Sequence, residues 1–194
     1  MELEYKVIDN FLSIEDADVI YYTMLGPNFP WYLNDSVVHK PSSTKKDFIE
    51  NYQFTHLFYQ FWTPCSRWFD TLRPITHKLN PPGWQRIKAN LNPKTENRII
   101  YDWHTDYTAD ITNAKTAIYY VNSNDGITLL KKDTKTPFDR ESTSYNNEEA
   151  IEIESVANRL VIFNQNIVHT GTTCTDTKVR CLINFNFVDE NRNE

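Results

Sequence analysis

The stretch RLVIFNQNIVHTGTTCTDTKVRCLINFNF, residues 159–187, carries the clearest pattern in this chain of 194 residues. Its last part alternates, as a strand with two different faces does. One face holds Val179, Cys181, Ile183, Phe185 and Phe187, and the other holds Arg180, Leu182, Asn184 and Asn186. We expect the apolar face to pack against helices. The polar face predicts a ligand pocket, because a barrel interior that holds an Arg and two Asn is costly as a dry core.

Short alternating segments separated by turn signals fill the rest of the second half of the chain. The predicted strands are 85–91, 98–104, 116–121, 127–130, 150–154, 159–163 and 179–188, with turns at residues 124–126 and 170–171. The charged stretch 131–149 reads as a loop or as a lid over a substrate. The pattern indicates an all-β barrel or sandwich braced by helices.

The first part of the chain is predicted to be mainly helical after one short strand at 5–8. Ser13 is placed to cap a helix that Gly26 and Pro27 end. Residues 28–47 read as loop, and a second helical stretch is expected at 64–79, broken near Pro74. We therefore expect one domain over 1–194, with a helical support region at 1–82 and a β core at 83–190.

Composition excludes several classes of protein. The net charge of −6 argues against a nucleic-acid partner. No apolar run approaches the roughly 18 residues of a membrane span, and the N-terminus lacks the pattern of a secretory signal. The three cysteines lack the spacing of metal-binding motifs, and we interpret them as free thiols in a reducing cytoplasm. Only four glycines are present, with no phosphate-binding motif among them.

Three residues could hold a metal ion. His104 and Asp106 are two positions apart at the end of a predicted strand, and His169 follows another. Two imidazoles and one carboxylate form the facial triad of non-heme Fe(II) sites, which leaves three coordination positions open. The same residues could bind zinc, and such a pattern also arises by chance, so spacing alone leaves the choice open.

A cation follows the second histidine. Arg180 lies eleven residues after His169, across a predicted turn that returns the chain to the same region. A buried guanidinium requires a carboxylate partner, which is either a bound acid or a structural ion pair. Lys178 has the same strand parity and is the alternative to Arg180.

Together these motifs resemble the Fe(II)- and 2-oxoglutarate-dependent dioxygenases, and most closely the prolyl 4-hydroxylase-like branch, including small phage-encoded members. The resemblance covers residues 90–187 and rests on YDWHTD (101–106), AIYYVNSNDGITLL (117–130) and the stretch quoted first. Asp125-Gly126 departs from the family's Gly-Gly pair. The resemblance implies a double-stranded β-helix, or jelly-roll, core.

The resemblance also implies roles for single residues. His104, Asp106 and His169 would bind Fe(II). Arg180 would bind the distal carboxylate of 2-oxoglutarate, with Lys178 as the alternative. Tyr120 would help to hold that carboxylate, and Tyr101 and the inward-facing Asn184 would line the co-substrate pocket. Asn92 falls where relatives place a further pocket residue. Tyr101 and His104 have opposite strand parity, so both can face the site only if the strand is interrupted.

The implied activity is hydroxylation of a C–H bond with O2 as oxidant and release of succinate and CO2. A prolyl residue is the first expected substrate, with a free amino acid or small metabolite as the alternative. The expected partners are a peptide or small molecule, without membrane or nucleic acid, in the cytoplasm (the host cytoplasm for a phage protein). A non-catalytic metal-binding β-barrel module remains the alternative from another class.

Overall fold

The computed structural model describes residues 4–37, 51–106, 113–132 and 150–189. The predicted lid at 131–149 lies almost wholly outside these residues. The strands are β1 (Tyr5–Ile8), β2 (Tyr32–Asn34), β3 (Gln53–Gln60), β4 (Thr63–Pro64), β5 (Gly83–Pro93), β6 (Ala114–Tyr120), β7 (Asn124–Lys131), β8 (Ala150–Ser155), β9 (Arg159–Asn164), β10 (His169–Gly171) and β11 (Val179–Val188). The helices are α1 (Ile14–Met24), the 3-10 turn η1 (Phe69–Leu72) and α3 (Arg73–Leu79).

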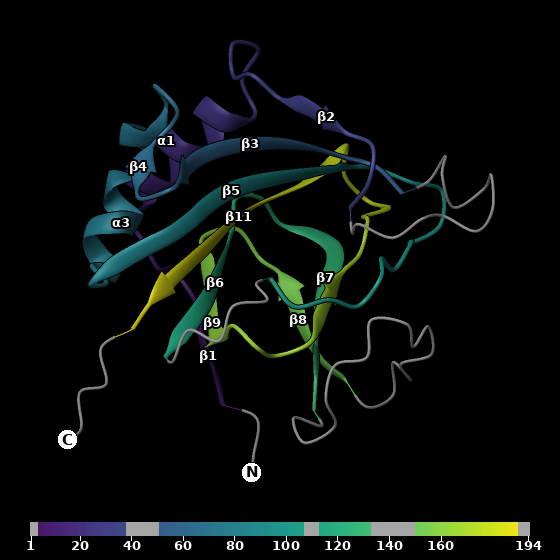
Figure 1. The fold of residues 1–194 in the computed structure, drawn as a ribbon. Coiled ribbons are helices and arrows are strands. Elements are labelled where there is room, and N and C mark those ends of the chain that lie inside the picture. The colour runs from purple at the N-terminus through teal and green to yellow at the C-terminus, as the bar shows by residue number, and fades with distance from the viewer. Residues whose placement is uncertain (1–3, 38–50, 107–112, 133–149, 190–194) are drawn as a thin grey trace.

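The strands form two antiparallel sheets. The larger sheet has the order β1-β9-β6-β11-β5-β3-β2, with β4 added to β3, and the smaller has the order β10-β7-β8. Figure 1 shows α1 and α3 on one side of the larger sheet and the smaller sheet on its other side. The mainly β architecture with flanking helices and a jelly-roll core is therefore confirmed.

The two faces of β11 divide the interior as the sequence predicts. Its odd-numbered residues from Cys181 to Phe187 belong to one apolar core, which also contains Ile20 and Met24 of α1 and Leu72 and Ile75 from the second helical region. On the opposite face, Leu182 packs in a second cluster with residues of the smaller sheet such as Leu130 and Ile153. The polar residues of that inner face are left to surround a pocket.

Helix α1 begins where the sequence predicts. The Ser13 side chain accepts a hydrogen bond from the Asp16 backbone N–H at 3.1 Å, and Glu15 and Asp16 lie in the first turn. The side-chain oxygen satisfies an N–H that has no partner within the helix, and the carboxylates suit the positive end of the helix dipole. The helix ends at Met24, just before the predicted Gly26-Pro27 stop.

Three expectations about local structure are wrong. The first 82 residues are not mainly helical, since β3 is an eight-residue strand that pairs with β5, and β2 lies in the predicted loop 28–47. The second helical stretch begins only at residue 69, because residues 63–64 form β4. Residues 170–171 are not a turn but part of β10, which pairs with β7.

The predicted strand at 98–104 is also wrong. Among the described residues of this segment, only two isolated bridges form, Ile100 with Thr172 and His104 with His169. Without a continuous ladder the backbone is free to turn between them, so Tyr101 and His104 both line the pocket despite their opposite parity. This removes the conflict that strand geometry posed for these two residues.

No helix within the described ranges is both long and apolar enough to cross a membrane.

Candidate metal centre

The backbone brings the two candidate histidine ligands together. The N–H of His104 donates to the carbonyl of His169, and the N–H of His169 donates back to His104, each at 2.9 Å. This antiparallel bridge fixes the imidazoles side by side, with ring centroids 4.6 Å apart. Asp106 follows two residues after His104 and completes the group.

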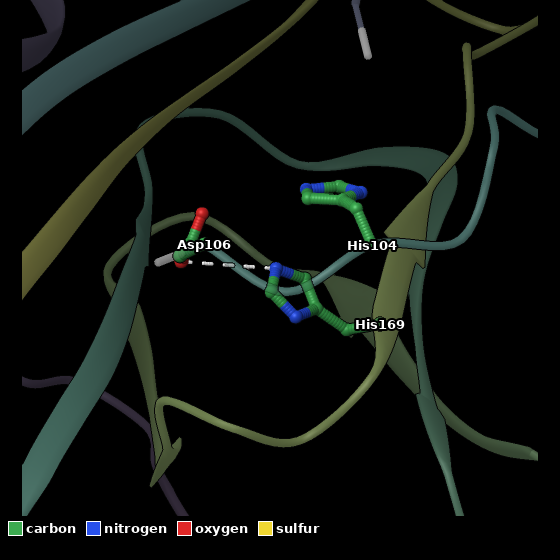
Figure 2. A group of neighbouring side chains, drawn as sticks. All are labelled: His104, Asp106 and His169. Atoms are coloured by element: carbon green, nitrogen blue, oxygen red, sulfur yellow. Dashed lines mark ion pairs between the residues drawn. The ribbon is translucent and has the colours of Figure 1, made fainter. Parts of the chain in front are cut away.

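The three side chains point at a common centre (Figure 2). One ligand atom from each of His104, Asp106 and His169 lies within 4.8 Å of the others, and the His169 Nε2 to Asp106 Oδ2 distance is 3.8 Å. Three adjacent ligand atoms, each about 2.1 Å from one ion, lie about 3 Å apart, so the side chains would have to move closer together to bind it. The donor set fits a divalent transition metal.

Hydrogen bonds already set the tautomer of both imidazoles. The Nδ1 of His104 lies 3.1 Å from the carbonyl oxygen of Asp102, and the Nδ1 of His169 lies 2.9 Å from that of Ile167. A carbonyl oxygen only accepts, so each Nδ1 carries a hydrogen and each Nε2 is the ring nitrogen left to bind a metal. Burial, reinforced by His169, lowers the pKa of His104 to about 4, which keeps this imidazole neutral near pH 7.

Four side chains hold the Asp106 carboxylate. Oδ2 accepts from Asn184 at 2.9 Å and from Thr116 and Asn186 at 3.0 Å each, and Oδ1 accepts from Arg86 at 3.3 Å. Burial by itself would raise the pKa of Asp106, but the nearby His169 and Arg86 outweigh it and hold that pKa well below its usual range. Asp106 is therefore a fixed carboxylate, as a metal ligand has to be.

The candidate ligands line one end of an open pocket, and Arg180 lines the same pocket. Arg180 is only 2% exposed. Its Nε donates to Ser155 Oγ at 2.9 Å and its Nη2 to Thr128 Oγ1 at 2.8 Å. No carboxylate of the described residues lies within 4.0 Å of this guanidinium, so the structural ion-pair alternative gains no support there.

Two of the four glycines make room for Arg180. A Cβ on Gly126 would lie 2.5 Å from Arg180 Cδ, and one on Gly171 would lie 3.1 Å from Nη1. Neither glycine has a positive φ, so close approach rather than backbone conformation explains them. The guanidinium therefore lies in a cradle formed by Gly126 and Gly171.

The other predicted site residues take different places. Tyr101 lines the pocket, and its hydroxyl accepts from Asn92 Nδ2 at 3.2 Å. Tyr120 lies behind the pocket wall and donates to Thr128 at 2.8 Å, so it supports a residue that contacts Arg180. Lys178 lines a separate pocket beside α1.

Some pocket residues escaped the sequence analysis. Gln53, Lys88, Asn90 and Thr128 line the pocket, and Arg86 and Thr116 contact Asp106. The sequence of residues 86–92 could have indicated some of them, because its even-numbered positions are all polar and predict a polar face of a strand (Arg86, Lys88, Asn90 and Asn92). In the structure these residues occupy the inner face of β5 and pair with β11, Arg180 opposite Asn92 and Asn184 opposite Lys88.

Comparisons with known proteins extend these observations. Neither the scan against protein families nor the search of curated proteins finds a match. Among solved structures, a prolyl hydroxylase from Trichoplax adhaerens in complex with a hypoxia-inducible-factor peptide has a TM-score of 0.65 at 12% identity, covering 95% of this chain and 83% of that one. A Pseudomonas putida prolyl-4-hydroxylase has a TM-score of 0.55 at 15% identity, covering 97% and 94%.

An alpha-ketoglutarate-dependent non-heme epimerase of nogalamycin biosynthesis is also similar, with a TM-score of 0.65 at 12% identity, covering 96% of this chain and 77% of that one. This chain thus shares the fold of these three enzymes, two of which are described as prolyl hydroxylases and one as an epimerase. At such low identity the likeness establishes the fold alone.

Proposed function

We propose that this protein is an Fe(II)- and 2-oxoglutarate-dependent oxygenase that hydroxylates a C–H bond of its substrate. The observation that carries the proposal is one pocket with two chemically distinct ends. One end has two imidazole Nε2 atoms and a carboxylate around a common centre, and the other has a buried guanidinium without a described carboxylate partner.

His104, Asp106 and His169 would hold the iron. Their Nδ1 hydrogen bonds and the donors around Asp106 keep the three ligand atoms oriented before a metal binds. Three protein ligands leave positions open for a co-substrate and dioxygen, which suits Fe(II) better than a closed four-ligand zinc site. When bound, Fe(II) with 2-oxoglutarate and O2 supplies the oxidising chemistry, in which the keto acid becomes succinate and CO2 as the substrate gains a hydroxyl group.

Arg180 would bind the distal carboxylate of 2-oxoglutarate. Its hydrogen bonds to Ser155 and Thr128 fix the plane of the guanidinium, and the glycine cradle sets its depth. Tyr120 orients Thr128 from behind, and Tyr101 and Asn92 form the adjoining wall. Arg180 lines this pocket while Lys178 faces another, which favours Arg180 as the carboxylate partner. Asn184 uses its side-chain N–H to hold Asp106, so we assign it mainly to orienting that ligand and only secondarily to contacting the co-substrate.

A prolyl residue of a peptide is the first substrate class to test, because two proteins of the same fold are described as prolyl hydroxylases. A free amino acid or small metabolite is the alternative, which the following subsection takes further.

The test begins with anaerobic addition of Fe(II) and 2-oxoglutarate to the metal-free protein. We expect a visible charge-transfer band, followed by release of succinate when air is admitted. A folded protein that binds metal but gives neither signal would instead be a non-catalytic metal-binding module, and the proposal would be abandoned. Metal analysis of the same sample distinguishes bound zinc from iron.

A further inference from the structure

The pocket contains a second cation that the roles above leave unused. Lys88 lies on the inner face of β5, directly opposite Asn184 of β11, and lines the pocket beside the candidate metal ligands. Asn184 in turn donates to the Asp106 carboxylate, so Lys88 lies toward the metal end of the pocket, whereas Arg180 pairs with Asn92 further along the strands.

Lys88 has no described counter-ion of its own. Asp106 is the one acid among the described residues that line the pocket, and Arg86 already contacts it at 3.3 Å. No carboxylate of the described residues, Asp106 included, lies within 4.0 Å of the Lys88 ammonium. Although the whole chain has a net charge of −6, the described residues that line this pocket therefore include more cations than anions.

The excess remains when the proposed ligands are counted. A ferrous ion, the Asp106 carboxylate and the two carboxylates of 2-oxoglutarate leave one negative charge, which Arg180 balances. With Arg86, which contacts Asp106, and Lys88 included, the described groups sum to two positive charges, so a further anion is favoured beside Lys88. Burial, reinforced by Arg86 and opposed by Asp106, lowers the pKa of Lys88 to about 8.

Two acceptor oxygens near Lys88 lack donors. Asn184 must direct Nδ2 at the Asp106 carboxylate, since that group only accepts, and this turns Oδ1 the other way. Asn184 Oδ1 and Asn90 Oδ1 are buried without a hydrogen-bond partner among the described residues, and both residues line the pocket. Buried oxygens of this kind require a donor from a bound molecule or water.

We propose that Lys88 binds a carboxylate of the substrate, and that Asn90 and Asn184 accept from an N–H or O–H group of the same molecule. The inference rests on the proposed function and narrows its substrate to a small carboxylic acid with a nearby hydrogen-bond donor, such as an amino or hydroxy acid. An internal prolyl residue of a neutral peptide would leave Lys88 unpaired.

The test uses the protein loaded with Mn(II), which is paramagnetic and does not support turnover, and saturated with 2-oxoglutarate. Acetate and acetamide, which have nearly the same shape but differ in charge, are titrated in turn. Paramagnetic relaxation of their methyl protons reports binding near the metal. We expect saturable relaxation for acetate and about tenfold weaker binding of acetamide, since a charge-assisted contact is lost.

Lys88→Met should lower acetate binding to the level of acetamide, and Lys88→Arg should restore most of it. Lys94→Met, an exposed lysine just beyond β5, is the matched control and should behave as wild type. Acetate relaxation that survives Lys88→Met would mean direct binding to the metal and would overturn the proposal. If Lys88→Met does not fold, the wild-type protein still tests the proposal. Equal binding of acetate and acetamide to the wild type would by itself overturn it.

Calorimetric titration of 2-oxoglutarate separates this proposal from the proposed function. We expect Lys88→Met to keep the wild-type affinity within about twofold, whereas a loss as large as that in Arg180→Met would assign Lys88 to the co-substrate instead. Absence of 2-oxoglutarate binding in the wild type defeats the proposed function, while acetate binding can still be measured. Among larger probes, N-acetylglycine should bind and an aspartate blocked at both backbone ends should not. The reverse would assign the carboxylate to a peptide side chain and overturn the small-acid inference.

Discussion

Replacing Arg180 with Met tests the co-substrate end of the pocket most directly. Met keeps the length and much of the apolar volume of the side chain but removes the charge and every donor. In the structure, Nε and Nη2 of Arg180 contact Ser155 and Thr128, and the guanidinium edge toward Gly171 faces the pocket. The substitution should therefore remove the contact with a bound carboxylate while leaving the metal ligands in place.

The expected loss follows from the kind of contact. Hydrogen bonds to charged groups contribute about 1.5–3 kcal/mol each, and a guanidinium can offer a carboxylate two of them. A net loss of about 3 kcal/mol corresponds to a roughly 150-fold higher Kd for 2-oxoglutarate. The free energy of unfolding should change by less than about 2 kcal/mol, because the variant loses two hydrogen bonds but no longer buries a cation.

The assay is an anaerobic titration of 2-oxoglutarate into the Fe(II) protein, monitored by the intensity of the charge-transfer band. The affinity for iron is measured in a separate experiment. We expect the co-substrate affinity to fall while iron affinity, measured without 2-oxoglutarate, changes by less than about threefold, because the hydrogen bonds of Arg180 go to Ser155 and Thr128 and not to a candidate iron ligand. Lys178→Met is the matched comparison, since this lysine lines another pocket. The reasoning is refuted if Arg180→Met weakens iron and 2-oxoglutarate equally, or if Lys178→Met produces the larger loss.

Three other predictions concern the surroundings of the site. Gly126→Ala places a Cβ 2.5 Å from Arg180 Cδ and should raise the Kd for 2-oxoglutarate about tenfold by displacing the guanidinium, and an unchanged Kd would count against the glycine cradle. Thr116→Val removes one donor to Asp106 and should weaken iron binding about tenfold in a competition titration, with no change in 2-oxoglutarate affinity once iron is saturating. The metal-free protein should lose roughly 2–3 kcal/mol of stability as pH falls from about 6.5 to about 4, because the pKa of His104 is lowered to about 4 and the unfolded chain gains a proton first. Denaturant melts at several pH values measure this loss, and His104→Gln should remove most of it; an identical slope in that variant would contradict the assignment.

The parts of the fold that follow regular periodicity could be predicted from the sequence. The two faces of β11 and the Ser13 cap of α1 depend on local pattern, so both were predicted correctly. Strand β3 was missed because its side chains do not alternate cleanly: its register with β5 shifts between Leu57 and Tyr59. An irregularity of this kind interrupts the period-two pattern on which strand prediction depends.

The candidate site shows the same limit. Its three possible metal ligands were named from sequence, and the structure brings them together. The segment before them was predicted as a strand because Ile99, Ile100 and Trp103 suit one. Its actual course, with two isolated bridges, depends on pairing with His169 of β10 and with Thr172 just after it, more than 60 residues away in the chain. The importance of Lys88 also depended on tertiary structure, since only the pairing of β5 with β11 places it beside Asn184.

The alignment of both imidazoles by backbone carbonyls has a practical consequence for anyone who purifies this protein. Both imidazoles present Nε2 to the centre before any metal binds, and two imidazoles with a carboxylate suit several divalent ions, among which the intrinsic order of affinity places zinc and copper above ferrous iron. The ion recovered with the protein will therefore reflect the metals supplied during expression and chromatography. Dependence on iron has to be established by stripping and reconstitution under argon, and not read from the elemental content of a purified sample.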